Sequence, residues 1–168
     1  AFTPMEEQDA LLEQTRRYFT NYGPASVRDA AYYFGSSQAE IKKRLARLPV
    51  EVAECEGQRL FSLHSGRMPE QAIPDCLLLA GFDPLVLGYE KKQSIFLPQE
   101  YLRGIFSLSG IVMPPVLLHG SVTGRWKHSG KHLLITQFRP FSQEERGFAE
   151  AAAAQLWGEA VQPVFQDA

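Results

Sequence analysis

A pair of short helices encoded between residues 23 and 48 constrains the fold of this chain more than any other feature. Ser26 precedes apolar residues at helical spacing, and Gly35 interrupts this first helix. Ser37 opens the second helix with Glu40 three residues later, which predicts a capping box in which each side chain satisfies a free backbone N–H group. Two helices joined by so tight a turn indicate a helix-turn-helix.

Strand-like runs at residues 50–55 and 59–63 follow the second helix and flank a turn at Gly57, where a positive φ is needed. Residues 6–22 have the apolar spacing of a helix that covers the other two. Three helices and a hairpin in this order predict a winged helix. We place this domain at residues 1–66, because the polar segment that follows contains prolines that disfavour a continuing element.

The second helix of the pair would be the recognition helix of a winged helix, and it carries cations on its outer face. At about 100° per residue, Ile41 and Leu45 lie inward, whereas Lys43 and Arg47 point outward with Lys42 on the flank. Contact with DNA phosphates and simple solvation both account for this pattern. The hairpin is acidic and would repel phosphate, so we assign it no DNA contact.

Composition limits the classes of function. The 168 residues carry a net charge of −2 with a pI near 6.1, so any nucleic-acid contact must come from a local basic patch. Cys55 and Cys76 are too few for a disulfide framework or a zinc knuckle, and we expect both to be reduced in the cytoplasm. No apolar run reaches membrane-spanning length and no signal peptide is visible, so we expect no membrane partner.

Residues 67–168 predict a second, mixed α/β domain, which makes the fold class α+β. Three strand-like segments separated by glycine turns predict an antiparallel β-meander, at residues 116–119, 122–128 and 132–138. A buried strand at 75–80 and a short helix at 98–106 would precede it. Ser142 and Glu145 then predict a capped C-terminal helix, whose inner stripe would be Phe148, Ala152 and Leu156.

The second domain also contains an acid-free stretch. No Asp or Glu occurs between Tyr101 and Gln143, although five cations lie there. Arg125 and Lys127 alternate with Trp126 along one predicted strand, so the cations share a face and the indole takes the other. A basic strand face suits phosphate binding. The alternative is a solvated sheet face, and under either interpretation we expect Trp126 in the core.

The residues alone indicate no active site. Nucleophile elbows, phosphate-binding glycine loops and zinc-protease helices are all absent from the sequence. His128 and His132 flank a Ser-Gly turn without a third ligand at a recognisable spacing, so we predict no metal site. We therefore name no catalytic residue and no cofactor.

Three ordered segments carry a resemblance to a known family: YFTNYGPASVRDAAYYFGSSQAEIKKRLARL, then LLLAGFDPLVLGYEKKQSIFLP, then PPVLLHGSVTGRWKHSGKHLLITQFRPFSQEERGFAEAAAAQL. Together they resemble the second half of a bacterial winged-helix DNA-binding-domain family that includes the alkylpurine and interstrand-crosslink DNA glycosylases. The resemblance covers roughly Tyr18 to Leu156 and depends on the ordered set of motifs. It implies tandem winged helices followed by a small β-barrel-like domain, arranged around duplex DNA.

The family's catalytic residues map onto no position of this chain. Glycosylase members carry a Gln-x-Gln or Gln-x-Asp pair in an N-terminal segment that would precede Ala1. No Gln here is followed two residues later by Gln or Asp, and the nearest pattern, Gln38-Ala39-Glu40, starts a helix. Relatives also tend to have a His and an Asp-Arg pair after Asp83-Pro84, where this chain has Tyr89-Glu90-Lys91-Lys92. Lysine does not replace the bidentate fork of arginine, which puts family-type catalysis in doubt.

We therefore predict a DNA-binding fragment, related to crosslink-repair glycosylases, that binds duplex DNA mainly through phosphates. The predicted contacts are Lys42, Lys43, Arg47, Lys91, Lys92, Arg125, Lys127 and Lys131. Its partners would be duplex DNA and the N-terminal part of the same protein, and any glycosylase activity would belong to that longer parent. The alternatives are a winged-helix transcriptional regulator and a protein-docking module without DNA binding.

Overall fold

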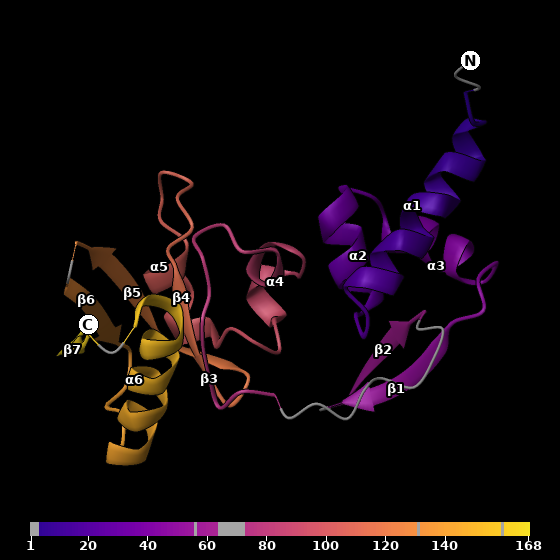
Figure 1. The fold of residues 1–168 in the computed structure, drawn as a ribbon. Coiled ribbons are helices and arrows are strands. Elements are labelled where there is room, and N and C mark those ends of the chain that lie inside the picture. Colours follow the sequence, from indigo (N-terminus) through magenta and orange to yellow (C-terminus); the bar gives the residue numbers. More distant parts are fainter. Residues whose placement is uncertain (1–3, 56, 64–72, 131, 159) are drawn as a thin grey trace. The chain divides into compact units, whose positions relative to one another are not determined.

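The computed structural model describes residues 4–55, 57–63, 73–130, 132–158 and 160–168. The chain divides into two compact units, one comprising Ala1–Glu70 with Leu87–Glu90 and the other Gln71–Val86 with Lys91–Ala168 (Figure 1). The predicted boundary after residue 66 lies outside the described residues and stays a prediction.

In its described residues, the first unit has the element order predicted for a winged helix (Figure 1). Helices α1 (Glu7–Asn21), α2 (Val27–Phe34) and α3 (Gln38–Leu45) precede the antiparallel strands β1 (Glu51–Cys55) and β2 (Gln58–Ser62). Phe19 and Ile41 are fully buried and Leu45 is 5% exposed, because these apolar residues recur at helical spacing on the facing sides of α1 and α3. Gly57 has a φ of 74°, as the turn requires.

The caps of α2 and α3 differ from one another. In α2 the Ser26 hydroxyl accepts a hydrogen bond from the Asp29 N–H, and the Asp29 carboxylate accepts one from the Ser26 N–H at 2.8 Å, a complete capping box. In α3 the Ser37 hydroxyl accepts from the Glu40 N–H, but the Glu40 carboxylate accepts from Lys43 Nζ at 2.9 Å. The reciprocal half of the capping box predicted for α3 is therefore wrong, because Lys43 holds the carboxylate one turn further along.

Residues Leu87–Glu90 belong to the first unit although they are distant in sequence. The Tyr18 hydroxyl donates to the Gly88 carbonyl at 2.7 Å, and the Tyr89 hydroxyl donates to the Tyr22 carbonyl at 2.6 Å. The Glu90 N–H donates to the buried Asp29 carboxylate at 2.9 Å. Burial raises the pKa of Tyr89 to about 12, so its hydroxyl stays protonated at neutral pH and can donate this hydrogen bond.

The second unit is built on a five-stranded sheet in the order β3-β4-β5-β6-β7. Its strands are β3 (Cys76–Leu78), β4 (Pro115–Leu118), β5 (Ser121–Ser129), β6 (His132–Gln137) and β7 (Pro163–Asp167). The predicted β4-β5-β6 meander is confirmed. The predicted barrel-like closure is wrong, because in the described residues β3 and β7 are edges of an open sheet. Strand β7, which the sequence analysis missed, pairs with β6 in parallel.

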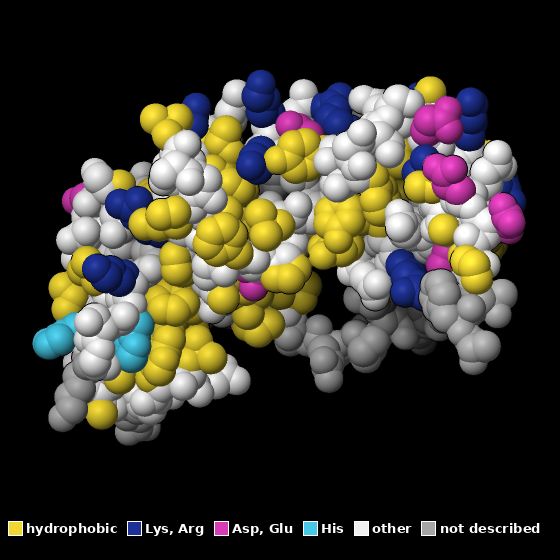
Figure 2. Space-filling model, turned by 90° about the horizontal axis from the view of Figure 1, so that it is seen from above, with side chains coloured by type: hydrophobic (Ala, Val, Ile, Leu, Met, Phe, Trp, Pro, Cys, Tyr) yellow, Lys and Arg dark blue, Asp and Glu magenta, His cyan; other side chains and the backbone are white. Residues whose placement is uncertain are grey.

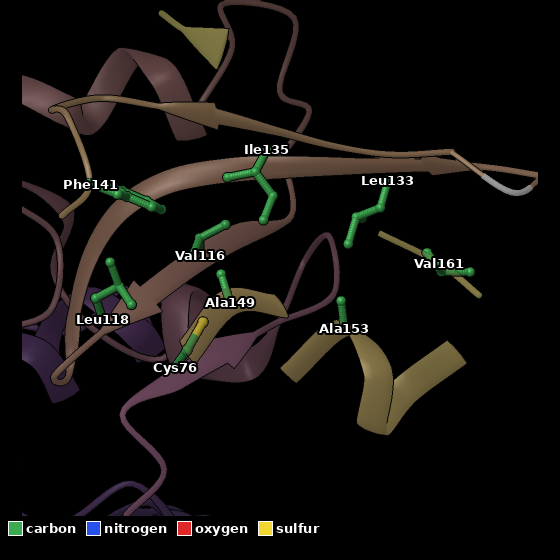
Figure 3. Close-up of a cluster of buried hydrophobic side chains, with 9 residues drawn as sticks. All are labelled: Cys76, Val116, Leu118, Leu133, Ile135, Phe141, Ala149, Ala153 and Val161. Atoms are coloured by element: carbon green, nitrogen blue, oxygen red, sulfur yellow. The ribbon is translucent and has the colours of Figure 1, made fainter. Parts of the chain in front are cut away.

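Helix α6 (Gln143–Trp157) covers one face of this sheet and contributes Ala149 and Ala153 to a buried cluster (Figure 3). Sheet residues such as Val116, Leu133 and Ile135 are fully buried beneath it. The predicted inner stripe is partly wrong: Phe148 and Ala152 flank this cluster, but Leu156 is 56% exposed. The capping box of Ser142 and Glu145 is confirmed.

Short elements cover part of the opposite face. They are α4 (Pro84–Leu87), η1 (Lys91–Gln93), η2 (Gln99–Tyr101) and α5 (Leu102–Ile105), the last two confirming the predicted helix at 98–106. Ile105 and Phe106 pack there on Leu117 and Val122 of the sheet. No helix in the described part of the chain has both the length and the apolar composition needed to cross a bilayer.

Candidate nucleic-acid interface

The eight predicted phosphate contacts are divided between the two units. Lys42, Lys43 and Arg47 belong to the first unit, and the others to the second. Lys131 lies outside the described residues. The predicted contacts therefore form two sets, one in each unit.

Lys43 of α3 and Arg47, which follows the helix, lie beside carboxylates. Lys43 pairs with Glu40 at 2.9 Å, and Arg47 lies 3.9 Å from Asp9 of α1. The hydrogen bond from Lys43 lowers the pKa of Glu40, so this acid stays ionised and its negative charge persists. Lys42 is exposed on the flank of the helix. Figure 2 shows the result on the right, where Asp and Glu side chains lie between those of Lys and Arg.

Strand β5 presents a different environment. Arg125 and Lys127 lie on one face, and Trp126 lies on the other, where its Nε1–H donates to the Leu79 carbonyl at 2.8 Å and its ring packs against the α6 cluster. Trp126 therefore faces the buried cluster, as predicted, but it is only partly buried itself. The partners of the two cations on the neighbouring strands are uncharged: Pro115 and Thr136 flank Arg125, and Leu134 is paired with Lys127. No carboxylate from these paired positions reduces their potential.

The fold brings Arg125 to a second predicted cation that is distant in sequence. Arg125 Nη1 donates to the Gly104 carbonyl at 3.3 Å, and Lys91 Nζ lies 4.2 Å from the centroid of the Phe106 ring. Both cations therefore contact the segment formed by residues 104–106. Position 104 requires glycine, because the Phe138 ring occupies the space that a Cβ would need.

Two further lysines and one arginine complete the basic set of the second unit. Lys92 is exposed next to Lys91, and Lys127 is exposed two residues after Arg125. Arg103 is exposed on α5, directly before Gly104, and was not among the predicted contacts. Arg103 lies in the stretch without acids, and this sequence pattern could have identified it as a further contact. On the left of Figure 2, the Lys and Arg side chains of this unit lie among exposed hydrophobic side chains. We call Lys91, Lys92, Arg103, Arg125 and Lys127 the basic surface.

Arg139 lies in the acid-free stretch but is held by an acid from α6. Its Nη2 lies 2.6 Å from Glu145 Oε1, and its Nη1 donates to Oε2 at 2.9 Å. These hydrogen bonds lower the pKa of Glu145 to about 2 and raise that of Arg139. His119 similarly lies 3.4 Å from Asp75. Arg139 is therefore part of the helix cap and is left out of the basic surface.

The histidines provide no metal centre in the described residues. His128 stacks on Trp157 with ring centroids 4.7 Å apart, and His132 is exposed at the start of β6. No group of three or more His, Cys, Asp or Glu side chains that could hold an ion occurs in this part of the chain. The arrangement suits electrostatic binding of an extended polyanion.

Comparisons with known proteins relate the chain to one family of enzymes. A family model described as "DNA glycosylase AlkZ-like" matches residues 1–158. The chain is 27% identical over 149 residues to an interstrand DNA cross-link repair glycosylase of Streptomyces sahachiroi, covering 84% of this chain and 39% of that protein. Its fold is similar to that of the solved DNA glycosylase AlkZ of the same organism, with a TM-score of 0.80, 20% identity, and coverage of 99% of this chain and 48% of the other. The chain thus spans less than half the length of these relatives.

Proposed function

The chain belongs to the AlkZ-like DNA glycosylase family, and from this premise we propose that it binds duplex DNA mainly through phosphate contacts made by the basic surface of its second unit. The observation that carries the proposal is that Arg125 and Lys91 both contact residues 104–106, which belong to a stretch with no acid between Tyr101 and Gln143. Clustered cations attract phosphates and displace their counterions.

We assign the remaining predicted contacts a secondary role. Lys131, which lies outside the described residues, stays a proposed contact on the basis of the sequence. Lys42 and Lys43 of α3, and Arg47 just after it, would approach phosphate from the first unit, but Glu40 and Asp9 reduce the attraction of Lys43 and Arg47. Binding would be largely independent of sequence, because phosphate contacts fix position and carry no base information.

We place any base-excision chemistry outside these 168 residues. The chain has no Gln followed two residues later by Gln or Asp, and it covers only 39% of the crosslink-repair glycosylase. The proposed role of this chain within such an enzyme is to hold the duplex, while another segment of the same protein supplies the pocket and the catalytic residues. Excision of an alkylated purine by the full-length protein, lost when the basic surface is neutralised, would support this division of labour.

The test is a salt titration of duplex binding, followed by fluorescence anisotropy of a labelled duplex. We compare the parent chain with Arg125→Ala/Lys127→Ala. Each lost phosphate contact should reduce the slope of log K against log salt by about 0.9, so the double variant should lose about 1.8 and bind more weakly at low salt. Arg16→Ala/Arg17→Ala is the matched control, because Glu13 already pairs with both arginines. Equal slopes for the parent and Arg125→Ala/Lys127→Ala would contradict the proposal.

A protein-docking role is the second candidate, favoured by an aromatic surface on the first unit. Tyr32 and Tyr33 are 43% and 45% exposed, and Tyr33, Phe34 and Tyr22 line a groove of about 370 Å³ between α1 and α2. Large exposed aromatic side chains are typical of protein interfaces. Docking of this kind would survive salt concentrations that abolish phosphate binding, so the same titration separates the two functions.

A further inference from the structure

The loop of residues 107–111, between α5 and β4, is closed by its own hydrogen bonds. The Ser107 N–H donates to the Ile111 carbonyl at 2.9 Å, and the Gly110 N–H donates to the Ser107 carbonyl at 3.2 Å. The Ser107 hydroxyl also accepts from the Ile111 N–H at 2.9 Å. Phe106 and Val112 form an antiparallel bridge at its base. In Figure 1 the loop projects beyond α5 and β4 as a narrow extension. We call it the 107–111 loop.

The tip of this loop is apolar and exposed. Leu108 is 90% exposed, more than any other large hydrophobic residue in the described part of the chain, and Ile111 is 50% exposed. The loop contains no charged residue. Exposing a leucine on a loop that is held in one conformation has no benefit for folding, since burial of that side chain would be favourable. Leu108 and Ile111 together give the loop an apolar tip, and burial of such a tip against a partner would be favourable.

The base of the loop is positively charged. Lys91 lies over the ring of Phe106, the residue that precedes the loop, and Arg125 donates to the carbonyl of Gly104. Arg103 is exposed on α5 immediately before Gly104. An apolar tip beyond cations that would contact phosphate is complementary to a duplex, in which the charged backbone surrounds the apolar faces of stacked bases.

We propose that the 107–111 loop is a wedge that inserts Leu108 between adjacent base pairs of the bound duplex. This inference rests on the proposed DNA binding and goes beyond it, because it assigns an intercalating residue and a deformation of the DNA. Proteins that kink DNA insert leucine, isoleucine or phenylalanine side chains into a base step, at an unstacking cost of a few kcal/mol. Burial of Leu108 and the phosphate contacts at the base of the loop would offset this cost.

The wedge is pre-formed, which distinguishes it from a flexible loop. Three hydrogen bonds within five residues, together with the φ of 84° at Gly110, hold the chain reversal before any partner binds. Little conformational entropy would therefore be lost when Leu108 enters the stack.

The experiment uses the complete 168-residue chain and a short duplex that carries 2-aminopurine, whose fluorescence increases when the base is unstacked. The parent chain should increase the fluorescence at saturation. Leu108→Ala should abolish most of this increase and raise Kd about tenfold, as expected for loss of a buried leucine side chain. Leu108→Met should restore the signal, since methionine supplies a similar apolar volume. Leu156→Ala removes an exposed leucine from α6 and should leave both readouts unchanged.

Each outcome separates the wedge from the proposed function. If the parent chain binds the duplex without any fluorescence increase, the wedge is wrong and DNA binding stands. If Leu108→Ala retains the full increase and the parent Kd, the wedge is equally overturned, and the apolar tip would be assigned to a protein partner. If the parent chain does not bind the duplex at any salt concentration, the proposed function itself fails. Thermal unfolding of each variant confirms folding, which substitution of a side chain that is 90% exposed should not disturb.

Discussion

Helix α3 and strand β5 carry the same kind of charge in opposite settings. On and just after α3, two cations lie beside acids: Lys43 is 2.9 Å from Glu40, and Arg47, two residues beyond the helix, is 3.9 Å from Asp9. On β5 the residues paired with Arg125 and Lys127 are uncharged. A helix brings residues three and four apart together, so Glu40 in the first turn of α3 meets Lys43 one turn later. A strand brings residues of other strands together, so its potential depends on segments distant in sequence.

The comparison shows that a count of cations does not locate a polyanion site. A count of cations alone does not distinguish α3 from β5. The order of elements would favour α3, because it occupies the position of the recognition helix in a winged helix. The positions of the carboxylates decide between them. Four predictions test this difference, from the largest expected effect to the smallest.

Charge reversal should separate the two elements most clearly. Arg125→Glu/Lys127→Glu should weaken duplex binding about 100-fold at low salt, because two attractive contacts become repulsive. Lys43→Glu/Arg47→Glu should weaken it only about threefold, since nearby acids already reduce those potentials. Anisotropy titrations at one fixed ionic strength give both values. A larger effect from the α3 pair would reverse the comparison.

The stability of the sheet that carries Arg125 and Lys127 should depend on the absence of a side chain at Gly124. A Cβ there would lie 2.7 Å from the Thr136 carbonyl oxygen, so Gly124→Ala must push β5 away from β6 and should cost about 2 kcal/mol of unfolding free energy. The matched control is Gly147→Ala in α6, where a Cβ meets nothing within 4 Å and alanine should stabilise the helix by about 1 kcal/mol. Urea unfolding measures both. If both variants lost stability equally, the packing argument for Gly124 would not hold.

In the second unit, Arg139 is paired with Glu145, and acid should remove the contribution of this pair to stability. The pKa of Glu145 is lowered from 4.5 to about 2 in the folded chain, so the pair contributes its full stability above about pH 4.5 and loses it as the pH falls toward 2. The expected loss for this partly exposed, bidentate pair is about 1 kcal/mol. Urea unfolding at mildly and strongly acidic pH measures it. In Arg139→Ala this part of the pH dependence should disappear, and an unchanged profile would show that the pair contributes nothing.

Removing the acid on α3 should have the smallest effect. Glu40→Gln keeps the shape of the side chain but frees Lys43 from its ion pair, so duplex affinity should rise about twofold if α3 approaches phosphate. Glu13→Gln on α1 is the matched control, because it also frees arginines but lies outside the predicted contacts. Equal increases for the two variants would indicate only a change in net charge.

Local patterns predicted most of the elements, and non-local pairing explains what they missed. The Ser37 and Ser142 caps, the β4-β5-β6 meander and the position of Trp126 follow from neighbouring residues. Strand β7 did not, because its five residues are mostly exposed and its pairing with β6 depends on the crossover through α6. The open sheet of the described residues, with β3 and β7 at its edges, also differs from the barrel-like domain that the family resemblance implied.

The candidate site followed the same rule. Alternation placed Arg125 and Lys127 on one face, and the acid-free stretch marked the region. The contacts of Arg125 and Lys91 with residues 104–106 and the exposure of Leu108 required the structure, because these contacts join segments that no sequence period relates.

The contribution of residues 87–90 to the first unit limits how that unit can be exchanged or isolated. A polypeptide that ends at residue 66 would lack the peptide groups that satisfy the Tyr18 hydroxyl and the Asp29 carboxylate. A segment that carried only the three helices and the hairpin would leave the Tyr18 hydroxyl without this acceptor, whereas the Asp29 carboxylate would lose the Glu90 N–H and keep its bonds from Ser26. A graft of this unit therefore has to include residues 87–90 to keep its buried hydrogen bonds.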